Sequence, residues 1–329
     1  MKNGKRPRPS LDEATNNYFT SDKPDLRFVH SGCTVLDCAL GGGWCLGRIA
    51  NIIGDKSTSK THLAWEALTN FLKQYPDGKA AYRETEAAFD PGYAKAMGFP
   101  INKVLMLDDR LPTVEAFERD IKRYIEKLNG QPGMYVLDSL DALSDEAELK
   151  LEPGKGTYGA SKAKGLSAMF RKIVASVEAS NVNLMIISQI RDKIGVMFGE
   201  KHSRSGGHAL DFYASHIVKL AYLGRIKKTV KGITLPVGIS IKAQTQKNKI
   251  GFNFRDCEFD FRNAFGIDDV AASGAWLKEK KRASIWKGET IDDLDKDDYL
   301  EMQEVLAAQV KKVWAEVETS FLPKWSKYG

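Results

Sequence analysis

An alternation of short apolar segments with longer helical segments constrains the fold of this chain more than any other sequence feature. The apolar segments are 49–53, 79–83, 104–107, 134–137 and 182–188. The segments with helical character between them are 61–75, 90–97, 113–128 and 163–179. Short buried strands that alternate with helices are typical of a parallel sheet covered on both faces. The pattern therefore predicts an α/β fold with a mostly parallel central sheet.

The pattern changes after residue 215. Segments 217–222, 233–242 and 252–261 read as strands joined by turns, which predicts an antiparallel extension of the sheet. Beyond residue 266 the chain holds a basic run at 278–282, an acidic turn at 292–298 and an amphipathic helix at 297–318. We therefore expect three parts: a short N-terminal arm (1–30), a core (31–265) and a small C-terminal domain (266–329).

The turn after the first apolar segment reads GDKSTSKT at 54–61 and is close to the phosphate-binding pattern G-x-x-x-x-G-K-[ST]. Backbone amides of such a loop surround phosphates, and the helix that follows adds the positive end of its dipole. Ser59 stands at the second glycine position. The residues assigned to nucleotide binding are Gly54, Asp55, Lys56, Ser57, Thr58, Ser59, Lys60 and Thr61. A Ser/Thr-rich turn that only caps a helix is the alternative.

Two oxygen ligands are candidates for Mg²⁺. The hydroxyl of Thr61 follows Lys60, whose ammonium would reach the β and γ phosphates and serve catalysis. Asp138 ends the apolar segment 134–137, where P-loop proteins place the carboxylate that holds the metal. An aspartate that merely caps the next turn is the alternative to this assignment.

Composition argues against two classes of protein. Hydrophobic residues make up 43% of the 329 residues, which favours a sizeable core over global disorder. No apolar run reaches the roughly 20 residues of a bilayer-spanning helix, and the basic start of the chain lacks the apolar segment of a secretory signal. We therefore expect a cytoplasmic protein without a membrane partner. The net charge of +6 permits a polyanionic partner without proving one.

Three of the four cysteines, Cys33, Cys38 and Cys45, lie close together in the sequence. Their spacing contains no Cys-x-x-Cys pair, which structural zinc sites commonly use. The sequence therefore favours small thiols that are buried or half-buried in a reducing compartment.

Five segments in order resemble the bacterial RecA recombinases and the phage strand-exchange proteins of the UvsX kind. They are GCTVLDCALGGGWCLGRI (32–49), ETEAAFDPGYAKAMG (84–98), VLDSLDAL (136–143), QIRDKIGVMFG (189–199, continuing to 215) and KNKI (247–250). The resemblance covers roughly residues 31–261. It implies a RecA-like P-loop NTPase core, ATP and Mg²⁺ as cofactors, and DNA-dependent ATP hydrolysis. It also implies a helical filament on single-stranded DNA that pairs with double-stranded DNA and exchanges strands during recombination and repair.

The resemblance implies roles for further residues. Glu86 matches the carboxylate that positions or activates the attacking water. Gln189 matches the amide that senses the γ-phosphate and passes its state to a DNA-binding loop. Asp90 and Tyr93 match residues that contact adenine, Tyr93 by stacking. On residue type alone, a solvated loop glutamate and an amide at the end of a strand would explain Glu86 and Gln189 equally well.

Lys247 and Lys249 match the pair that reaches the ATP of the neighbouring protomer in a RecA filament. Because side chains alternate along a strand, two lysines separated by one residue would share a face. A solvated strand edge would show the same pattern.

Two glycine-containing basic loops are candidates for DNA binding, at about 148–164 and 191–208. Cations neutralise phosphates, and apolar side chains wedge between bases or stack on them. The assigned residues are Lys162, Lys164, Arg191, Lys193, Met197, Phe198, Gly206 and Gly207. Mobile surface loops would have the same composition.

Two other functions remain open at the level of sequence. Ser59 in the phosphate loop and a divergent arm also fit a RecA-fold protein that coats DNA or acts as a mediator, with weak or no hydrolysis. A hexameric motor of the same fold is a further alternative. The segment 189–199 argues against it.

Overall fold

The computed structural model describes residues 26–107, 111–146, 158–192, 202–204, 207–325 and 327. Within these residues one ten-stranded sheet has the order β12-β11-β10-β9-β3-β7-β6-β4-β5, and β8 (His202–Arg204) pairs with β7. The strands on one side of the sheet run parallel to one another. They are β3 (Ile49–Gly54), β4 (Lys79–Glu84), β5 (Val104–Leu105), β6 (Gly133–Asp138) and β7 (Val182–Asp192).

The antiparallel extension begins at β9 (His216–Val230), which is parallel to β3 on one side and antiparallel to β10 (Ile233–Asn248) on the other. The strands β11 (Asp256–Arg262) and β12 (Gly266–Ile267) continue the antiparallel order. The predicted α/β fold, with a mostly parallel sheet and an antiparallel extension, is confirmed.

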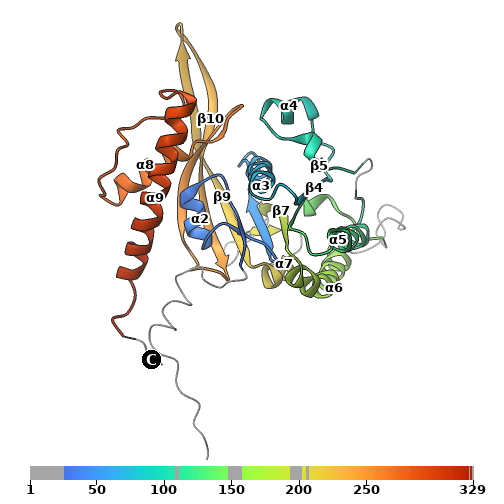
Figure 1. Ribbon diagram of the computed structural model, residues 1–329. Helices are drawn as coiled ribbons and strands as arrows, with labels where there is room; N and C mark the ends of the chain where they lie inside the picture. The colour runs from blue at the N-terminus through green and yellow to red at the C-terminus, as the bar shows by residue number, and fades with distance from the viewer. Residues whose placement is uncertain are drawn as a thin grey trace, which may run out of the picture.

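Helices cover both faces of the sheet (Figure 1). The helix α3 (Lys60–Gln74) lies on one face, and α5 (Val114–Leu128), α6 (Tyr158–Ala179) and α7 (Gly207–Tyr213) lie on the other. In β3, Ala50 and Ile52 join the core beneath α3, whereas Ile49 and Ile53 join the core beneath α5 and α6. Because both faces are buried, the strand reads as an unbroken apolar run rather than as an alternation.

The helix α5 shows why the sequence predicted its position so closely. Its buried residues recur at intervals of three or four: Val114, Phe117, Ile121, Tyr124 and Leu128. This spacing places one apolar stripe against the sheet. The hydroxyl of Thr113 caps the helix by accepting a hydrogen bond from the Ala116 amide at 3.1 Å.

Several predicted boundaries are wrong. The segment 104–107 supplies only the two-residue β5, and the strand predicted at 252–261 is β11 at Asp256–Arg262. The residues before β11 form turns, because the Asn248 side-chain oxygen accepts the amides of Ile250 and Gly251 at 2.8 Å each. The helix α6 begins at Tyr158, ahead of the predicted start at residue 163.

The C-terminal residues pack on the core through two helices, α8 (Asp269–Glu279) and α9 (Lys296–Ser320). The rings of Trp276 and Trp314 stack between these helices with centroids 5.4 Å apart. Leu306 and Val310 of α9 belong to the same buried cluster as the core beneath α3. The helix α2 (Thr34–Leu40), which was not predicted from the sequence, also contacts α9.

The predicted arm falls almost entirely outside the described residues. Its last part forms β1 (Phe28–Val29), which pairs with β2 (Trp44–Cys45) in a separate two-stranded sheet. The short helix α4 (Pro91–Ala96) lies between β4 and β5 in the sequence. The division into arm, core and C-terminal domain stays a prediction.

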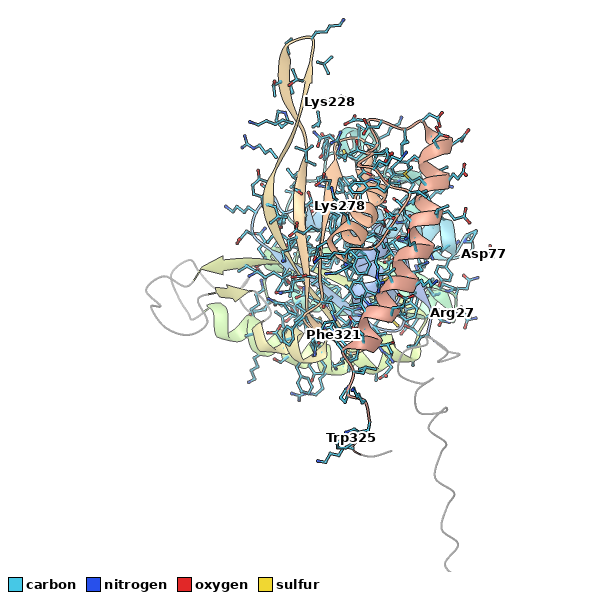
Figure 2. The ribbon with its side chains drawn as sticks, turned by 90° about the vertical axis from the view of Figure 1, so that its left-hand side faces the viewer. Arg27, Asp77, Lys228, Lys278, Phe321 and Trp325 are labelled. Carbon is cyan, nitrogen blue, oxygen red and sulfur yellow. The ribbon has the colours of Figure 1, made fainter. Side chains whose placement is uncertain are left out.

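The strands β9 and β10 extend beyond the rest of the sheet as a two-stranded ribbon that turns at Lys231 and Gly232 (Figure 2). Within the ribbon, the ammonium of Lys228 in β9 forms an ion pair with Asp292 at 2.6 Å. Asp292 also accepts a hydrogen bond from the Arg262 guanidinium. The ribbon is therefore held to the segment between α8 and α9.

Two other sequence predictions concern side-chain burial and membranes. Cys33, Cys45 and Cys257 are buried and Cys38 is half-buried, so the predicted burial of these thiols is confirmed. In the part of the chain that the structure describes, no helix has the length and apolar character needed to cross a bilayer.

Candidate nucleotide-binding site

The phosphate loop connects β3 to α3. Gly54 has no room for a side chain, because a Cβ there would lie 2.7 Å from the Leu220 carbonyl oxygen and 2.8 Å from the Thr58 hydroxyl. Ser59 caps α3 in the left-handed region, with φ 58° and ψ 30°. This region favours glycine, and a residue with a Cβ there loses about 1 kcal/mol. The backbone therefore has the turn that glycine ordinarily provides, with serine in its place.

Lys60 lies inside this loop. Its ammonium donates hydrogen bonds to the carbonyl oxygens of Gly54 at 3.0 Å and Asp55 at 2.6 Å. Burial lowers the pKa of Lys60, and the nearby carboxylates of Asp138 and Glu86 partly oppose that shift. The cation is thus held at the centre of the loop, where phosphate oxygens would replace the backbone carbonyls.

Thr61 and Asp138 are brought together as predicted. The Thr61 hydroxyl donates to a carboxylate oxygen of Asp138 at 2.7 Å, and the Tyr82 hydroxyl donates to the same oxygen at 2.8 Å. Burial raises the pKa of Asp138 to about 6, although both hydroxyls lower it. A hydroxyl beside a carboxylate is a hard-oxygen pair that suits Mg²⁺, so these residues fit the metal.

Glu86 and Gln189 are also brought together, although 103 residues separate them in the sequence. The Gln189 side-chain amide donates to a Glu86 carboxylate oxygen at 3.0 Å. The Ser139 hydroxyl donates to the same oxygen. In the sheet, Gln189 is the direct neighbour of Gly54. The end of β7 and the phosphate loop therefore meet at one edge of the sheet.

Asp141 fixes the backbone at this edge. One of its carboxylate oxygens accepts a hydrogen bond from the backbone amide of Gln189 at 2.7 Å. Its backbone carbonyl oxygen accepts a hydrogen bond from the Lys162 ammonium at 3.1 Å. Sequence reasoning missed Asp141, Ser139 and Tyr82. Their only sequence signal was position: the first two follow Asp138, and Tyr82 precedes the segment of Glu86.

Asp90 and Tyr93 begin α4. The Asp90 carboxylate caps the helix by accepting the Tyr93 amide at 2.5 Å. Tyr93 is 48% exposed, so part of this residue is open to solvent. Its hydroxyl lies 2.8 Å from Nε2 of His62, a residue of α3 that sequence reasoning missed. Burial lowers the pKa of His62 to about 4.

Lys247 and Lys249 do not share a strand face, so that part of the prediction is wrong. The strand β10 ends at Asn248, and Lys249 follows it with an exposed side chain. The Lys247 ammonium donates to the carbonyl oxygens of Asp211 and Phe212 at the end of α7.

Lys247 does not lie level with the phosphate loop of its own chain. Lys247 pairs with Ile217, and Ile217 pairs with Asn51, whereas Gly54 pairs with Leu220. Lys247 is therefore level with Asn51, in the middle of β3, and is offset from Gly54 by three residues, or roughly 10 Å, along the strand direction.

The structure describes only some of the residues that were predicted to bind DNA. Lys162 and Lys164 belong to α6 rather than to a loop, and Lys162 is held by the Asp141 carbonyl oxygen, so their placement in a loop is wrong. Gly207 begins α7, and the backbone of Arg191 lies in β7. Lys193, Met197, Phe198 and Gly206 lie outside the described residues.

A comparison with known protein families matches most of this chain. The family model "RecA N-terminal domain" matches residues 14–268. The chain belongs to the RecA family. It is 34% identical over 295 residues to Protein RecA of Francisella philomiragia, an alignment that covers 85% of this chain and 79% of the relative. It is 35% identical over 271 residues to Protein RecA of Delftia acidovorans, with 80% and 70% covered.

Membership of the RecA family decides between the functions that the sequence left open. This RecA-family chain is an ATP-dependent recombinase of DNA recombination and repair, and its enzymatic activity is that of a DNA-dependent ATPase. Nothing in the comparisons favours the alternative of a non-hydrolysing coating or mediator protein.

Proposed function

We propose that ATP binds at Gly54–Thr61 and that the state of its γ-phosphate is passed to DNA through Gln189. The observation that carries this proposal is the position of Gln189. It neighbours Gly54 in the sheet, contacts Glu86 at 3.0 Å, and lies three residues before the end of β7, where the second candidate DNA loop begins. A nucleotide at the phosphate loop would lie at the edge of the sheet where β7 ends and the second candidate DNA loop begins.

The residues of the site divide the chemical work. Glu86 would accept a proton from the attacking water, because its carboxylate lies at the loop and its contact with Gln189 can be exchanged for a water. Lys60 would stabilise negative charge on the transferred phosphoryl group. Thr61 and Asp138 would hold Mg²⁺, which when bound neutralises charge on the phosphates. Tyr93 would stack on adenine, with Asp90 fixing the start of its helix.

The same proposal assigns the DNA partners and the assembly. Single-stranded and double-stranded DNA would contact the region around the second loop, with Lys162 and Lys164 of α6 at its border. The remaining residues proposed for DNA contact are Arg191, Lys193, Met197, Phe198, Gly206 and Gly207. Lys247 and Lys249 would reach the ATP of a neighbouring protomer in a helical filament, because Lys247 is offset along the strands from the loop of its own chain. We place this activity in the cytoplasm of a bacterial or phage-infected cell.

The coupling through Gln189 is tested by two variants. Glu86→Gln is expected to bind ATP but to lose single-strand-stimulated hydrolysis by at least about 100-fold, because it cannot accept the proton. Gln189→Ala is expected to bind single-stranded DNA with an affinity that no longer rises when a non-hydrolysable ATP analogue is added. The measurements are phosphate release and titration of a labelled single strand, each with and without nucleotide.

Glu178→Gln is the matched control for this test. The Glu178 side chain is 66% exposed and forms only a surface ion pair with Arg48, at 3.4 Å. This variant should hydrolyse ATP and respond to the analogue as the wild type does. Wild-type hydrolysis in Glu86→Gln would refute the role of Glu86. Rings in electron micrographs, instead of helical filaments on single-stranded DNA, would refute the proposed assembly.

A further inference from the structure

An aromatic cluster surrounds the ring on which adenine is proposed to stack. Tyr93 lies beside His62 and Trp65, with ring centroids 5.6 Å and 6.3 Å away. The two residues belong to α3, the helix that begins at the phosphate loop. The residue Tyr93 is 48% exposed, so these two rings cover only part of it.

His62 supplies the polar contact that packing lacks. Its Nε2 lies 2.8 Å from the Tyr93 hydroxyl, a hydrogen bond whose donor depends on the tautomer of the ring. In the part of the chain that the structure describes, this hydrogen bond ties the tip of the Tyr93 side chain to α3.

His62 is itself held firmly. Its ring lies 4.7 Å from the ring of Phe261 at an interplanar angle of 31°, and it meets Trp65 edge-on at 5.4 Å. Phe261 is a buried residue of β11, and Trp65 is 6% exposed. An imidazole fixed between two buried rings offers a hydrogen-bonding atom at a fixed place. Since His62 follows Thr61 directly, the same turn of helix presents both the phosphate-side and the base-side groups.

We infer that His62 is a positioning residue for nucleotide binding: it holds Tyr93 so that its ring receives the adenine base. The inference rests on the proposed function, because it requires ATP at Gly54–Thr61 with its base on Tyr93. It adds to that function a source of affinity that is specific to the base. Stacking on a ring that is already oriented avoids the entropic loss of ordering it during binding.

The test separates the base from the phosphates by using two probes, ATP and inorganic tripolyphosphate, each titrated calorimetrically with Mg²⁺ into the full-length protein. His62→Leu replaces the imidazole with an apolar side chain of similar bulk and so removes the hydrogen bond. Tyr93→Phe keeps the ring but removes the hydroxyl. Each change is expected to weaken ATP binding by a factor between about 2 and about 12, the range that one hydrogen bond supplies. Tripolyphosphate binding should not change.

The double variant and a conservative variant complete the test. Because both single changes remove one and the same contact, His62→Leu with Tyr93→Phe should bind ATP no more weakly than either alone. His62→Gln should recover most of the affinity, since its amide nitrogen occupies a similar position to Nε2. Tyr75→Phe is the matched control: it removes a hydroxyl hydrogen bond to the Phe28 carbonyl oxygen, at 3.1 Å, just beyond the far end of α3.

Three results would overturn the inference. They are wild-type ATP affinity in His62→Leu, an equal loss of ATP and tripolyphosphate affinity, and losses that multiply in the double variant. Failure of the proposed function has a different signature. If the wild type bound neither probe, the nucleotide assignment itself would fall and the role of His62 with it. If Tyr93→Ala bound ATP as tightly as the wild type, the place of the base on Tyr93 would fall, and again the role of His62 with it.

Discussion

At the scale of single residues, Ser59 shows that a backbone turn can persist without the residue that best suits it. Its φ of 58° lies in the left-handed region, as does that of Ser57 at 59°. The loop nevertheless encloses Lys60, and the helix after it begins normally. The sequence departs from the phosphate-loop pattern at this position, but the conformation does not.

Replacing Ser59 by glycine should stabilise the protein. Glycine relieves the left-handed strain, although part of the gain is offset by the greater freedom of glycine in the unfolded chain, so we expect up to about 1 kcal/mol. The measurement is the free energy of unfolding in urea. Ser167→Gly, in the interior of α6, is the control with the opposite sign, since glycine within a helix destabilises by roughly 0.5–1 kcal/mol. A Ser59→Gly variant less stable than the wild type would contradict the account of strain.

At the level of single residues, the structure brings together candidates that two motifs placed at the same edge of the sheet. The hydrogen bond between Thr61 and Asp138 follows from two motifs at the same ends of parallel strands. The contacts of His62 with Tyr93 and of Ser139 with Glu86 could not be predicted in this way. They depend on how side chains of separate segments meet in space, and neither residue type nor spacing encodes that distance.

At the scale of elements, the sequence predicted the strands of the parallel sheet and the helices between them, including the short α4, but missed α2 and α8. The seven-residue α2 and the eleven-residue α8 carry too few turns for a periodic signal. The sequence predicted the strand that starts at residue 233 only to residue 242, whereas β10 continues to Asn248. The Asn248 side chain closes a turn by accepting two backbone amides, which moves Lys249 off the strand.

The helices α2, α8 and α9 meet at one buried carboxylate, Asp269. Its oxygens accept hydrogen bonds from the Thr34 backbone amide at 2.6 Å, the Thr34 hydroxyl at 2.8 Å and the Gln303 side-chain amide at 3.1 Å. Asp269→Ala should lower the free energy of unfolding by roughly 2–4 kcal/mol, because several buried donors lose their partner. Urea unfolding measures the change.

Asp297→Ala is the control for that prediction, since Asp297 lies exposed in the first turn of α9. It should alter stability by less than about 1 kcal/mol. If Asp269→Ala proved no more destabilising than Asp297→Ala, the carboxylate would not be what joins the three helices.

At the scale of the whole molecule, the C-terminal helices and the core enclose a groove of about 760 Å³ that Glu66 of α3 lines. Gly32 and Gly266 pass close to this side chain: a Cβ on Gly266 would lie 2.5 Å from a Glu66 carboxylate oxygen. Burial raises the pKa of Glu66 to about 7, which Lys73 and His30 only partly oppose. The junction between core and C-terminal helices therefore contains a group that titrates near neutral pH.

Glu66→Gln should change how stability depends on pH. The pKa of Glu66 is raised in the folded state, so its contribution is fully present below about pH 4.5 and is lost as pH rises through about 7. Glutamine does not titrate. Between pH 5 and pH 8 the variant should therefore gain about 2 kcal/mol of stability relative to the wild type. Thermal unfolding at both pH values measures this, with Glu178→Gln as control. A difference that does not vary with pH would contradict the prediction.

The offset of Lys247 from the phosphate loop of its own chain has a consequence for stoichiometry. If the lysines of one protomer complete the site of the next, as proposed, an open row of n protomers contains n − 1 complete sites. The protomer at one end then holds nucleotide with its own residues alone, and the lysines at the other end face solvent. The two ends would differ in nucleotide turnover, and short rows would hydrolyse less ATP per protomer than long ones.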